Sequence, residues 1–293
     1  MVLEVKNTIY SYYKLSKLRV VELLLITTVP AMIVSIYGFP PISLVLYTVI
    51  GGTFLAVSAN VLNQIFEIET DKLMKRTAQR PLVTGVISIR NAYIFSLGLG
   101  SVGFSMLYFL TTPLAAYIAL GANIFYSFIY TLVLKPRTDQ NIVIGGAAGA
   151  APVLIGWTAT GTDLDVGSWL LFLLVFLWTP AHFWALSIEN NDDYKDASFP
   201  MLSTLETKQR TSIYISIYSC ATVLTSLLVA PILQLGLVYL SIALLLGAYL
   251  MYKSFQLYKN KIEAISYFIF SNTYLAIVFL AMVADIFFTL RSI

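Results

Sequence analysis

The chain has 293 residues, of which 58% are hydrophobic and only 11% are charged, whereas about 25% of the residues in an average soluble domain are charged. The mean hydropathy of +0.81 and the spread of apolar runs along the chain exclude a water-soluble globular protein, and the net charge of +3 matters less than where Lys and Arg lie. A single cysteine, Cys220, and a single histidine, His182, exclude an intramolecular disulfide and any multi-histidine metal site built by this chain alone.

The apolar runs predict an all-α membrane protein. A barrel strand would alternate apolar and polar residues, but these runs are continuous, and continuous apolar runs satisfy their backbone in lipid only as helices. The whole chain, residues 1–293, is expected to form a single polytopic membrane domain. In chain order, nine transmembrane helices are predicted over residues 20–37, 42–62, 91–110, 113–134, 141–160, 168–188, 211–232, 236–252 and 264–288.

Lysine and arginine are distributed unevenly over the predicted loops. With the N-terminus in the cytoplasm, all but one of the 18 Lys and Arg residues fall on the cytoplasmic face, and only Arg291 falls on the other. Cytoplasmic loops carry an excess of these residues, and one span fewer would move every later loop across the membrane. The pattern therefore predicts a protein of the cytoplasmic membrane with nine spans, its N-terminus cytoplasmic and its C-terminus outside. The polar first 19 residues do not resemble a removable signal peptide.

The first polar segment, acidic motif 1 (residues 60–85), runs out of the second predicted span. Asn63, Glu67 and Asp71 follow one another at intervals of four residues, so on a helix they lie within roughly 80° of one face. Carboxylates at the end of a membrane helix are costly unless they are paired or hydrated, and Mg²⁺ prefers oxygen ligands while it bridges to phosphates. These three residues are therefore predicted metal ligands and catalytic residues.

A second polar segment, acidic motif 2 (residues 189–202), leaves the sixth predicted span on the same membrane face. Asp192 and Asp196 repeat the spacing of four residues and are predicted to add metal ligands, and Asp193 between them is predicted to be catalytic. Two acidic motifs that face each other would hold Mg²⁺ and, through it, a diphosphate.

Basic residues accompany the acidic ones on this face. A basic inner loop, residues 135–140, lies between the two acidic motifs in the sequence. Arg and Lys side chains bind phosphate oxygens. The predicted diphosphate ligands are Arg76, Arg80, Lys135 and Arg137. The alternative is that charges at a helix end form a solvated cytoplasmic flank, and this interpretation is favoured for Lys72, Lys75, Lys195, Lys208 and Arg210.

Acidic motif 1 contains the pattern Asn63-x3-Glu67-x3-Asp71-x2-Met74-x-Arg76-Thr77-x2-Arg80-Pro81-x3-Gly85. In this form it resembles the signature of the UbiA superfamily of intramembrane prenyltransferases. Residues 130–157 and 178–202 further resemble the branch of the superfamily that farnesylates haem. Three residues depart from the usual pattern: Glu67 stands where many members have Asp, Pro136 interrupts the basic loop, and Ala181 replaces a proline before His182.

The resemblance implies helices around a central cavity and an Mg²⁺-assisted reaction. A farnesyl group would pass from farnesyl diphosphate to a vinyl group of haem B, with addition of water, to give haem O. Haem B would be a substrate, contacted by His182 and Tyr194, although His182 is equally explained as a helix-interior histidine bonded to a neighbour. The implied partners are the lipid bilayer and a downstream haem A synthase or terminal oxidase, with no role for nucleic acid.

Two other functions remain open at this point. A sister prenyltransferase would use the same donor with an aromatic acid, a quinone precursor or a glyceryl phosphate lipid as acceptor. A cation-coupled transporter would use Glu67, Asp71 and Asp192 as an ion pathway. The position of these acids at helix ends, on one face, argues against transport, because transporter sites lie near the bilayer midplane.

Overall fold

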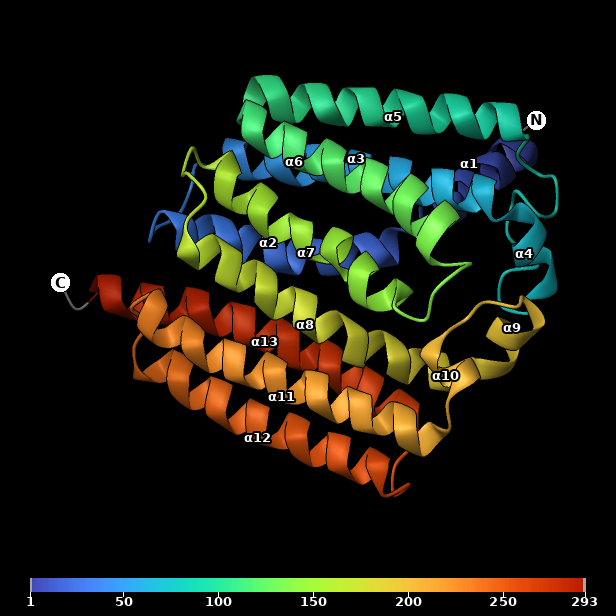
Figure 1. The fold of residues 1–293 in the computed structure, drawn as a ribbon. Coiled ribbons are helices and arrows are strands. Elements are labelled where there is room, and N and C mark those ends of the chain that lie inside the picture. The colour runs from blue at the N-terminus through green and yellow to red at the C-terminus, as the bar shows by residue number, and fades with distance from the viewer. Residues whose placement is uncertain (1, 292–293) are drawn as a thin grey trace.

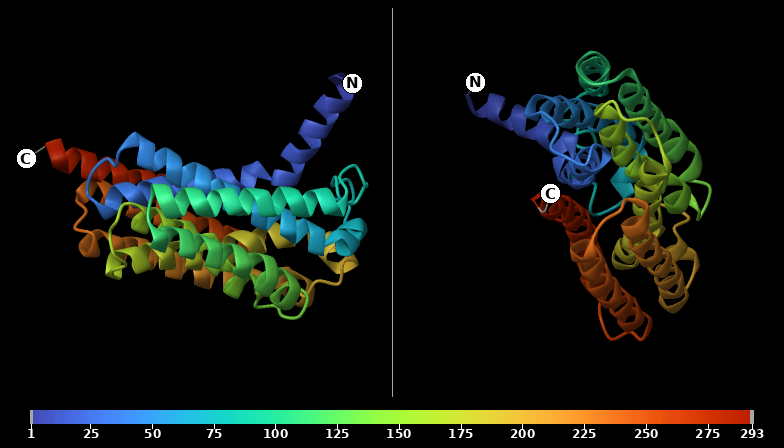
Figure 2. Two further views of the ribbon diagram at one scale, coloured as in Figure 1. Left: turned by 90° about the horizontal axis from the view of Figure 1, so that it is seen from above. Right: turned by 90° about the vertical axis from the view of Figure 1, so that its left-hand side faces the viewer.

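The computed structural model describes the backbone of residues 2–291 and the side chains of residues 9–18 and 26–288. The described residues form helices and connecting loops. The long helices run side by side along a common axis, and α1 leaves this bundle at an angle (Figures 1 and 2). In chain order the elements are α1 (Val2–Ser16), α2 (Leu18–Ser35), α3 (Ile42–Phe66), α4 (Ile68–Leu73), α5 (Ile89–Leu110), α6 (Pro113–Ile124), the π-helix η1 (Phe125–Leu134), α7 (Asn141–Ala159), α8 (Val166–Glu189), α9 (Asn191–Asp196), α10 (Leu202–Leu205), α11 (Lys208–Ile232), α12 (Leu237–Tyr258) and α13 (Ala264–Arg291).

Eight helical segments among the described residues are long and apolar enough to cross a membrane, so the chain is a multi-pass integral membrane protein. They are α3, α5, the continuous segment α6–η1, α7, α8, α11, α12 and α13. Each coincides with a predicted span. The remaining predicted span, 20–37, falls on α2, whose apolar part is counted only over Ile26–Ser35. The side chain of Arg291 and the two chain ends lie outside the described residues, so nine spans and the orientation of the termini stay predictions.

Small residues let several helices approach closely. A Cβ atom added to Gly103 of α5 would lie 2.6 Å from the carbonyl oxygen of Gly51 in α3, and one added to Gly156 of α7 would lie 2.4 Å from that of Thr28 in α2. Both distances are too short for a real side chain. Close packing through small residues is typical of membrane helices, which gain little from the hydrophobic effect in lipid.

The short helices α4, α9 and α10 gather at one end of the bundle (Figure 1). The backbone turns at Glu67, but the helical hydrogen bonds continue through it, because Glu67 N–H donates to the Asn63 carbonyl and Asp71 N–H to the Glu67 carbonyl. The end of α3 and the start of α4 therefore keep the predicted spacing along one face. Acidic motifs 1 and 2 thus lie at the same end of the molecule, as the sequence predicted.

Candidate active site

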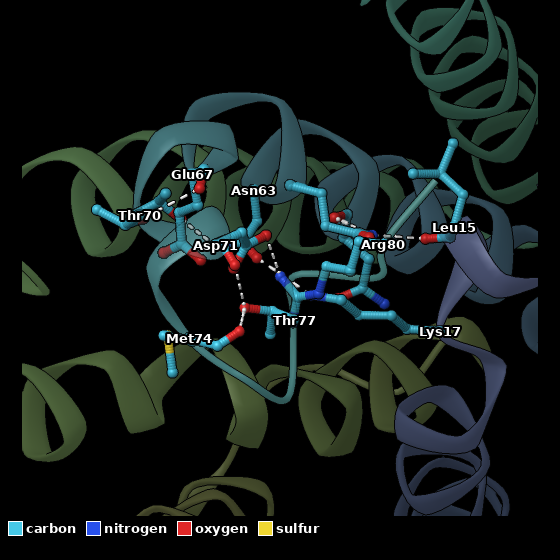
Figure 3. A network of polar contacts seen from close by, with 12 residues as sticks. Leu15, Lys17, Asn63, Glu67, Thr70, Asp71, Met74, Thr77 and Arg80 are labelled. Atoms are coloured by element: carbon cyan, nitrogen blue, oxygen red, sulfur yellow. Dashed lines mark hydrogen bonds and ion pairs between the residues drawn. The ribbon is translucent and has the colours of Figure 1, made fainter. Parts of the chain in front are cut away.

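The three regularly spaced residues of acidic motif 1 are buried at the junction of α3 and α4. Asn63 and Asp71 are each 2% exposed and Glu67 is 6% exposed. Ionised groups this well buried require partners. Figure 3 shows Asp71 together with Arg80, and Glu67 pairs with Lys135.

Two ion pairs neutralise the carboxylates. Lys135 donates to Oε1 of Glu67 and Arg80 donates to Oδ2 of Asp71, each at 2.5 Å. Thr77 Oγ1 donates to the backbone carbonyl of Asp71 at 2.9 Å, which closes the loop that carries Arg80 back onto α4. Arg80 and Lys135, two predicted phosphate ligands, thus form ion pairs with Asp71 and Glu67, two predicted metal ligands.

A third cation, Lys17, was not predicted to belong to the site. It lies between α1 and α2 in a left-handed conformation with φ of 48°, and its Nζ donates to Oδ1 of Asn63 at 3.2 Å. The joint between α1 and α2 is held to α3 by Gln64, whose Nε2 donates to the Leu15 carbonyl at 2.7 Å. Burial and the positive charge of Arg80 are the main causes that lower the pKa of Lys17 from 10.5 to about 7.

The π-helix η1 brings a second helix to the same residues. Thr131 accepts a hydrogen bond from Nδ2 of Asn63 at 3.1 Å, and Lys135, directly after η1, reaches Glu67. π-Helical turns are rare and often occur at functional sites. Thr131 in η1 and Lys135 directly after it thus both contact residues at the end of α3. The sequence predicted Lys135 as a site residue but not Thr131, because an uncharged threonine in an apolar span carries no signal of a functional role.

Acidic motif 2 meets acidic motif 1 through Asp193. Its two carboxylate oxygens accept hydrogen bonds from the backbone N–H groups of Lys75 and Arg76, each at 3.2 Å. Asp192 and Asp196 are exposed, whereas Tyr194 is buried at 7% exposure. Asp193 of α9 therefore links the two motifs by accepting hydrogen bonds from the loop after α4.

Two of the predicted phosphate ligands are not drawn into the buried cluster. The side chains of Arg76 and Arg137 are exposed, and Arg137 donates to the backbone carbonyl of Leu132 at 3.1 Å. Both lie at the same end of the molecule as the buried cluster, and their role as phosphate ligands stays a prediction.

The donor set fits a magnesium diphosphate better than a metal held by protein alone. Among the described residues, no three or more His, Cys, Asp or Glu side chains are close enough together to hold a metal ion. Mg²⁺ usually binds one or two carboxylates and keeps its other positions for water and substrate phosphates. Glu67, Asp71 and the amide oxygen of Asn63 could supply such ligands, and the adjacent cations would face the phosphates.

A cavity of about 710 Å³ lies within the bundle next to this cluster. Asn60, one turn before Asn63 on α3, lines it together with Tyr126 and Tyr130 of η1. The rest of the wall is mainly apolar and aromatic and includes Trp178 and His182 of α8. An apolar chamber beside a charged cluster could take a ligand with a charged head and a large apolar body.

Comparisons with known proteins agree with this arrangement. The chain matches the UbiA prenyltransferase family over residues 24–287. A curated relative from Paenarthrobacter aurescens (strain TC1), named protoheme IX farnesyltransferase, is 44% identical over 283 residues, which cover 94% of this chain and 88% of the relative.

Solved structures share the fold at lower identity. A structure described as digeranylgeranylglyceryl phosphate synthase in membranes has a TM-score of 0.77 at 22% identity and covers 96% of this chain and 99% of its own. A UbiA homologue from Archaeoglobus fulgidus bound to GPP and Mg²⁺ has a TM-score of 0.68 at 18% identity and covers 93% and 99%. Because the family match spans most of the chain and the curated relative is similar over nearly its whole length, the chain belongs to the UbiA prenyltransferase family.

Proposed function

We propose that this protein transfers a farnesyl group from farnesyl diphosphate to a vinyl group of haem B to form haem O. The observation that carries the proposal is the buried cluster of paired carboxylates and cations beside an apolar cavity that also contains the only histidine of the chain. The name of the curated relative supports the acceptor, and the GPP and Mg²⁺ bound by the archaeal homologue support the donor class.

The reaction would proceed by ionisation of the allylic donor. The C–O bond between farnesyl and diphosphate breaks, the farnesyl carbon bonds to the terminal vinyl carbon, water adds to the other vinyl carbon, and one proton is released. Arg80 and Lys135 would turn from their carboxylates to the phosphate oxygens and stabilise the charge that develops there. Bound Mg²⁺, held by Asn63, Glu67 and Asp71, would supply further electrostatic stabilisation of the diphosphate.

The acceptor would occupy the cavity. We place the haem between His182, which lines the cavity, and Tyr194, which is buried next to Asp193 at the diphosphate end. Aromatic walls such as Tyr126 and Tyr130 would shield a carbocation from bulk water.

We further propose nine spans with a cytoplasmic N-terminus and an external C-terminus, and delivery of the product to a haem A synthase or a terminal oxidase.

The proposal is tested with the purified full chain in detergent. Farnesyl diphosphate and Mg²⁺ are supplied with haem B, hydroxybenzoate, a naphthoate or a glyceryl phosphate lipid, and products are identified by mass spectrometry. We expect haem O and released diphosphate only with haem B. Prenylation of another acceptor alone would contradict the proposal, as would ion flux in liposomes without any product.

The role of His182 is tested separately. In a His182→Ala variant, we expect haem titration to show a changed Soret band and weaker binding. An unchanged Soret shift and affinity would exclude axial ligation by this residue.

A further inference from the structure

The imidazole ring of His182 is held on three sides by α8 and α13. It stacks between Trp178 and Phe268, with a centroid distance of 4.2 Å to each ring. Its Nδ1 lies 2.7 Å from Oγ of Ser271. Trp178 Nε1 also donates to the backbone carbonyl of Ser271 at 2.8 Å. These contacts fix both the plane of the ring and its rotation.

The contacts of Ser271 favour one tautomer of His182. The Ser271 hydroxyl donates to the backbone carbonyl of Phe268 at 2.8 Å. A hydroxyl has one proton, so Oγ must accept in its second hydrogen bond. Both short contacts of Oγ can be hydrogen bonds at the same time only if Nδ1 of His182 donates, which leaves a lone pair on Nε2 of the neutral ring.

The contacts of His182 leave the edge that carries Nε2 as the part of the ring that can face the cavity. Both faces of the ring and the Nδ1 edge are covered, yet His182 lines the cavity. The described residues place no hydrogen-bond donor on Nε2. An unprotonated Nε2 is the form of histidine that binds metals, and a hydrogen bond at the other nitrogen commonly fixes that form.

We infer that Ser271 is a positioning residue for the acceptor, because it holds His182 in the tautomer whose Nε2 can bind the iron of a metalloporphyrin in the cavity. The inference rests on the proposed function for the identity of the acceptor. It adds a residue on α13 that acts through His182 and a specific protonation state for that histidine.

The tautomer can be measured directly in the wild-type protein. Because the chain contains one histidine, ¹⁵N-labelled histidine in protein purified with a histidine-free affinity tag gives a single imidazole signal pair by solid-state NMR. We expect a protonated Nδ1 and an unprotonated Nε2 in the haem-free protein. A proton on Nε2 would overturn the inference.

Binding of a porphyrin with iron is compared with binding of the same porphyrin without iron, which separates an effect on iron ligation from a general change in structure. We expect Ser271→Ala to weaken binding of ferric protohaem on the order of tenfold or more, the usual effect of removing a hydrogen-bond partner of a metal-binding histidine. The same variant should bind metal-free protoporphyrin IX as the wild type does, and Ser271→Thr, which keeps the hydroxyl, should restore haem binding. Equal weakening of both porphyrins, or no weakening of either, would overturn the inference.

Haem O formation by the wild type is measured in the same preparation. If haem O forms and Nε2 carries the proton, the inference on Ser271 fails while the proposed function stands. If the wild type prenylates only a different acceptor, the proposed function fails and the inference fails with it.

Discussion

At the scale of single residues, the candidate site consists of buried charges that neutralise one another. Asp71 is 2% exposed and forms an ion pair with the guanidinium of Arg80. Glu67 forms an ion pair with the ammonium of Lys135. Breaking a buried ion pair by removal of one partner is costly. Substitutions that keep the shape of a side chain therefore separate catalysis from stability better than truncations do.

We expect Asp71→Asn to lower the rate of haem O formation on the order of 100-fold or more while the fold remains intact. Asn keeps an oxygen that can accept from Arg80, but it removes the charge required to hold Mg²⁺. The rate is measured by chromatography of the haem products across a range of Mg²⁺ concentrations, and the fold by gel filtration in detergent.

Glu69→Gln is the matched control for Asp71→Asn. Glu69 lies in the same short helix, but its side chain is 84% exposed and pairs with Lys72 on the surface. The Glu69→Gln variant should form haem O at the wild-type rate. Wild-type activity of Asp71→Asn at low Mg²⁺ would contradict the assignment of Asp71 to the metal site.

Lys17 predicts a pH dependence of stability. Its pKa is lowered from 10.5 to about 7 in the folded protein, so between these pH values the unfolded chain binds a proton that the folded protein does not. The stability contributed at this site therefore rises as the pH increases from 7 towards 10.5. We expect the unfolding temperature of the wild type, relative to that of Lys17→Met, to increase over this range. A difference that stays constant with pH would contradict the prediction.

At the scale of elements, Asp193 connects α9 to the loop after α4. Its carboxylate accepts from two consecutive backbone N–H groups, those of Lys75 and Arg76. This loop also carries Arg80, so the contact helps to position a residue of the buried cluster. Asp192 and Asp196, the predicted metal ligands on either side of this region of α9, are exposed and stay predictions.

We expect Asp193→Ala to release this loop. The amides of Lys75 and Arg76 should exchange with solvent on the order of tenfold faster, because they lose a charged acceptor. Hydrogen exchange followed by mass spectrometry measures this change. Asp192→Ala, which alters the exposed neighbouring carboxylate, is the control and should leave both amides as in the wild type. Unchanged exchange in Asp193→Ala would show that the contact does not hold the loop.

The sequence predicted these elements to different degrees. Continuous apolar runs marked the spans well, and residues 113–134 coincide with the helix Pro113–Leu134. The sequence did not reveal that the second half of this helix is a π-helix, because a continuous apolar run does not distinguish one helix type from the other. Lys17 also escaped prediction, because its contact with Asn63 joins residues 46 positions apart and depends on the angle between α1 and α2.

At the scale of the whole molecule, the orientation in the membrane decides which compartment supplies the diphosphate. The loop after α4 and the loop between α7 and α8 lie at opposite ends of the bundle (Figure 1). The excess of Lys and Arg at the α4 end predicts that this end is cytoplasmic.

Cysteine labelling tests this orientation. Cys220 is first replaced by serine, and single cysteines are introduced as Val86→Cys at the α4 end and Asp163→Cys at the other, both at exposed positions. We expect a membrane-impermeant maleimide to label Asp163→Cys in intact cells and Val86→Cys only after the cells are opened. The reverse pattern would contradict the predicted orientation.

Arg80 pairs with Asp71, and Lys135 pairs with Glu67. Each pair has no net charge, which lowers the cost of keeping its members buried at the edge of a low-dielectric bilayer. If an anionic headgroup binds together with a divalent cation, we expect the carboxylates to pair with the divalent cation and Arg80 and Lys135 to pair with the headgroup. Such an exchange would let the ligand enter and leave without stranding any of these four groups as a buried, unpaired charge.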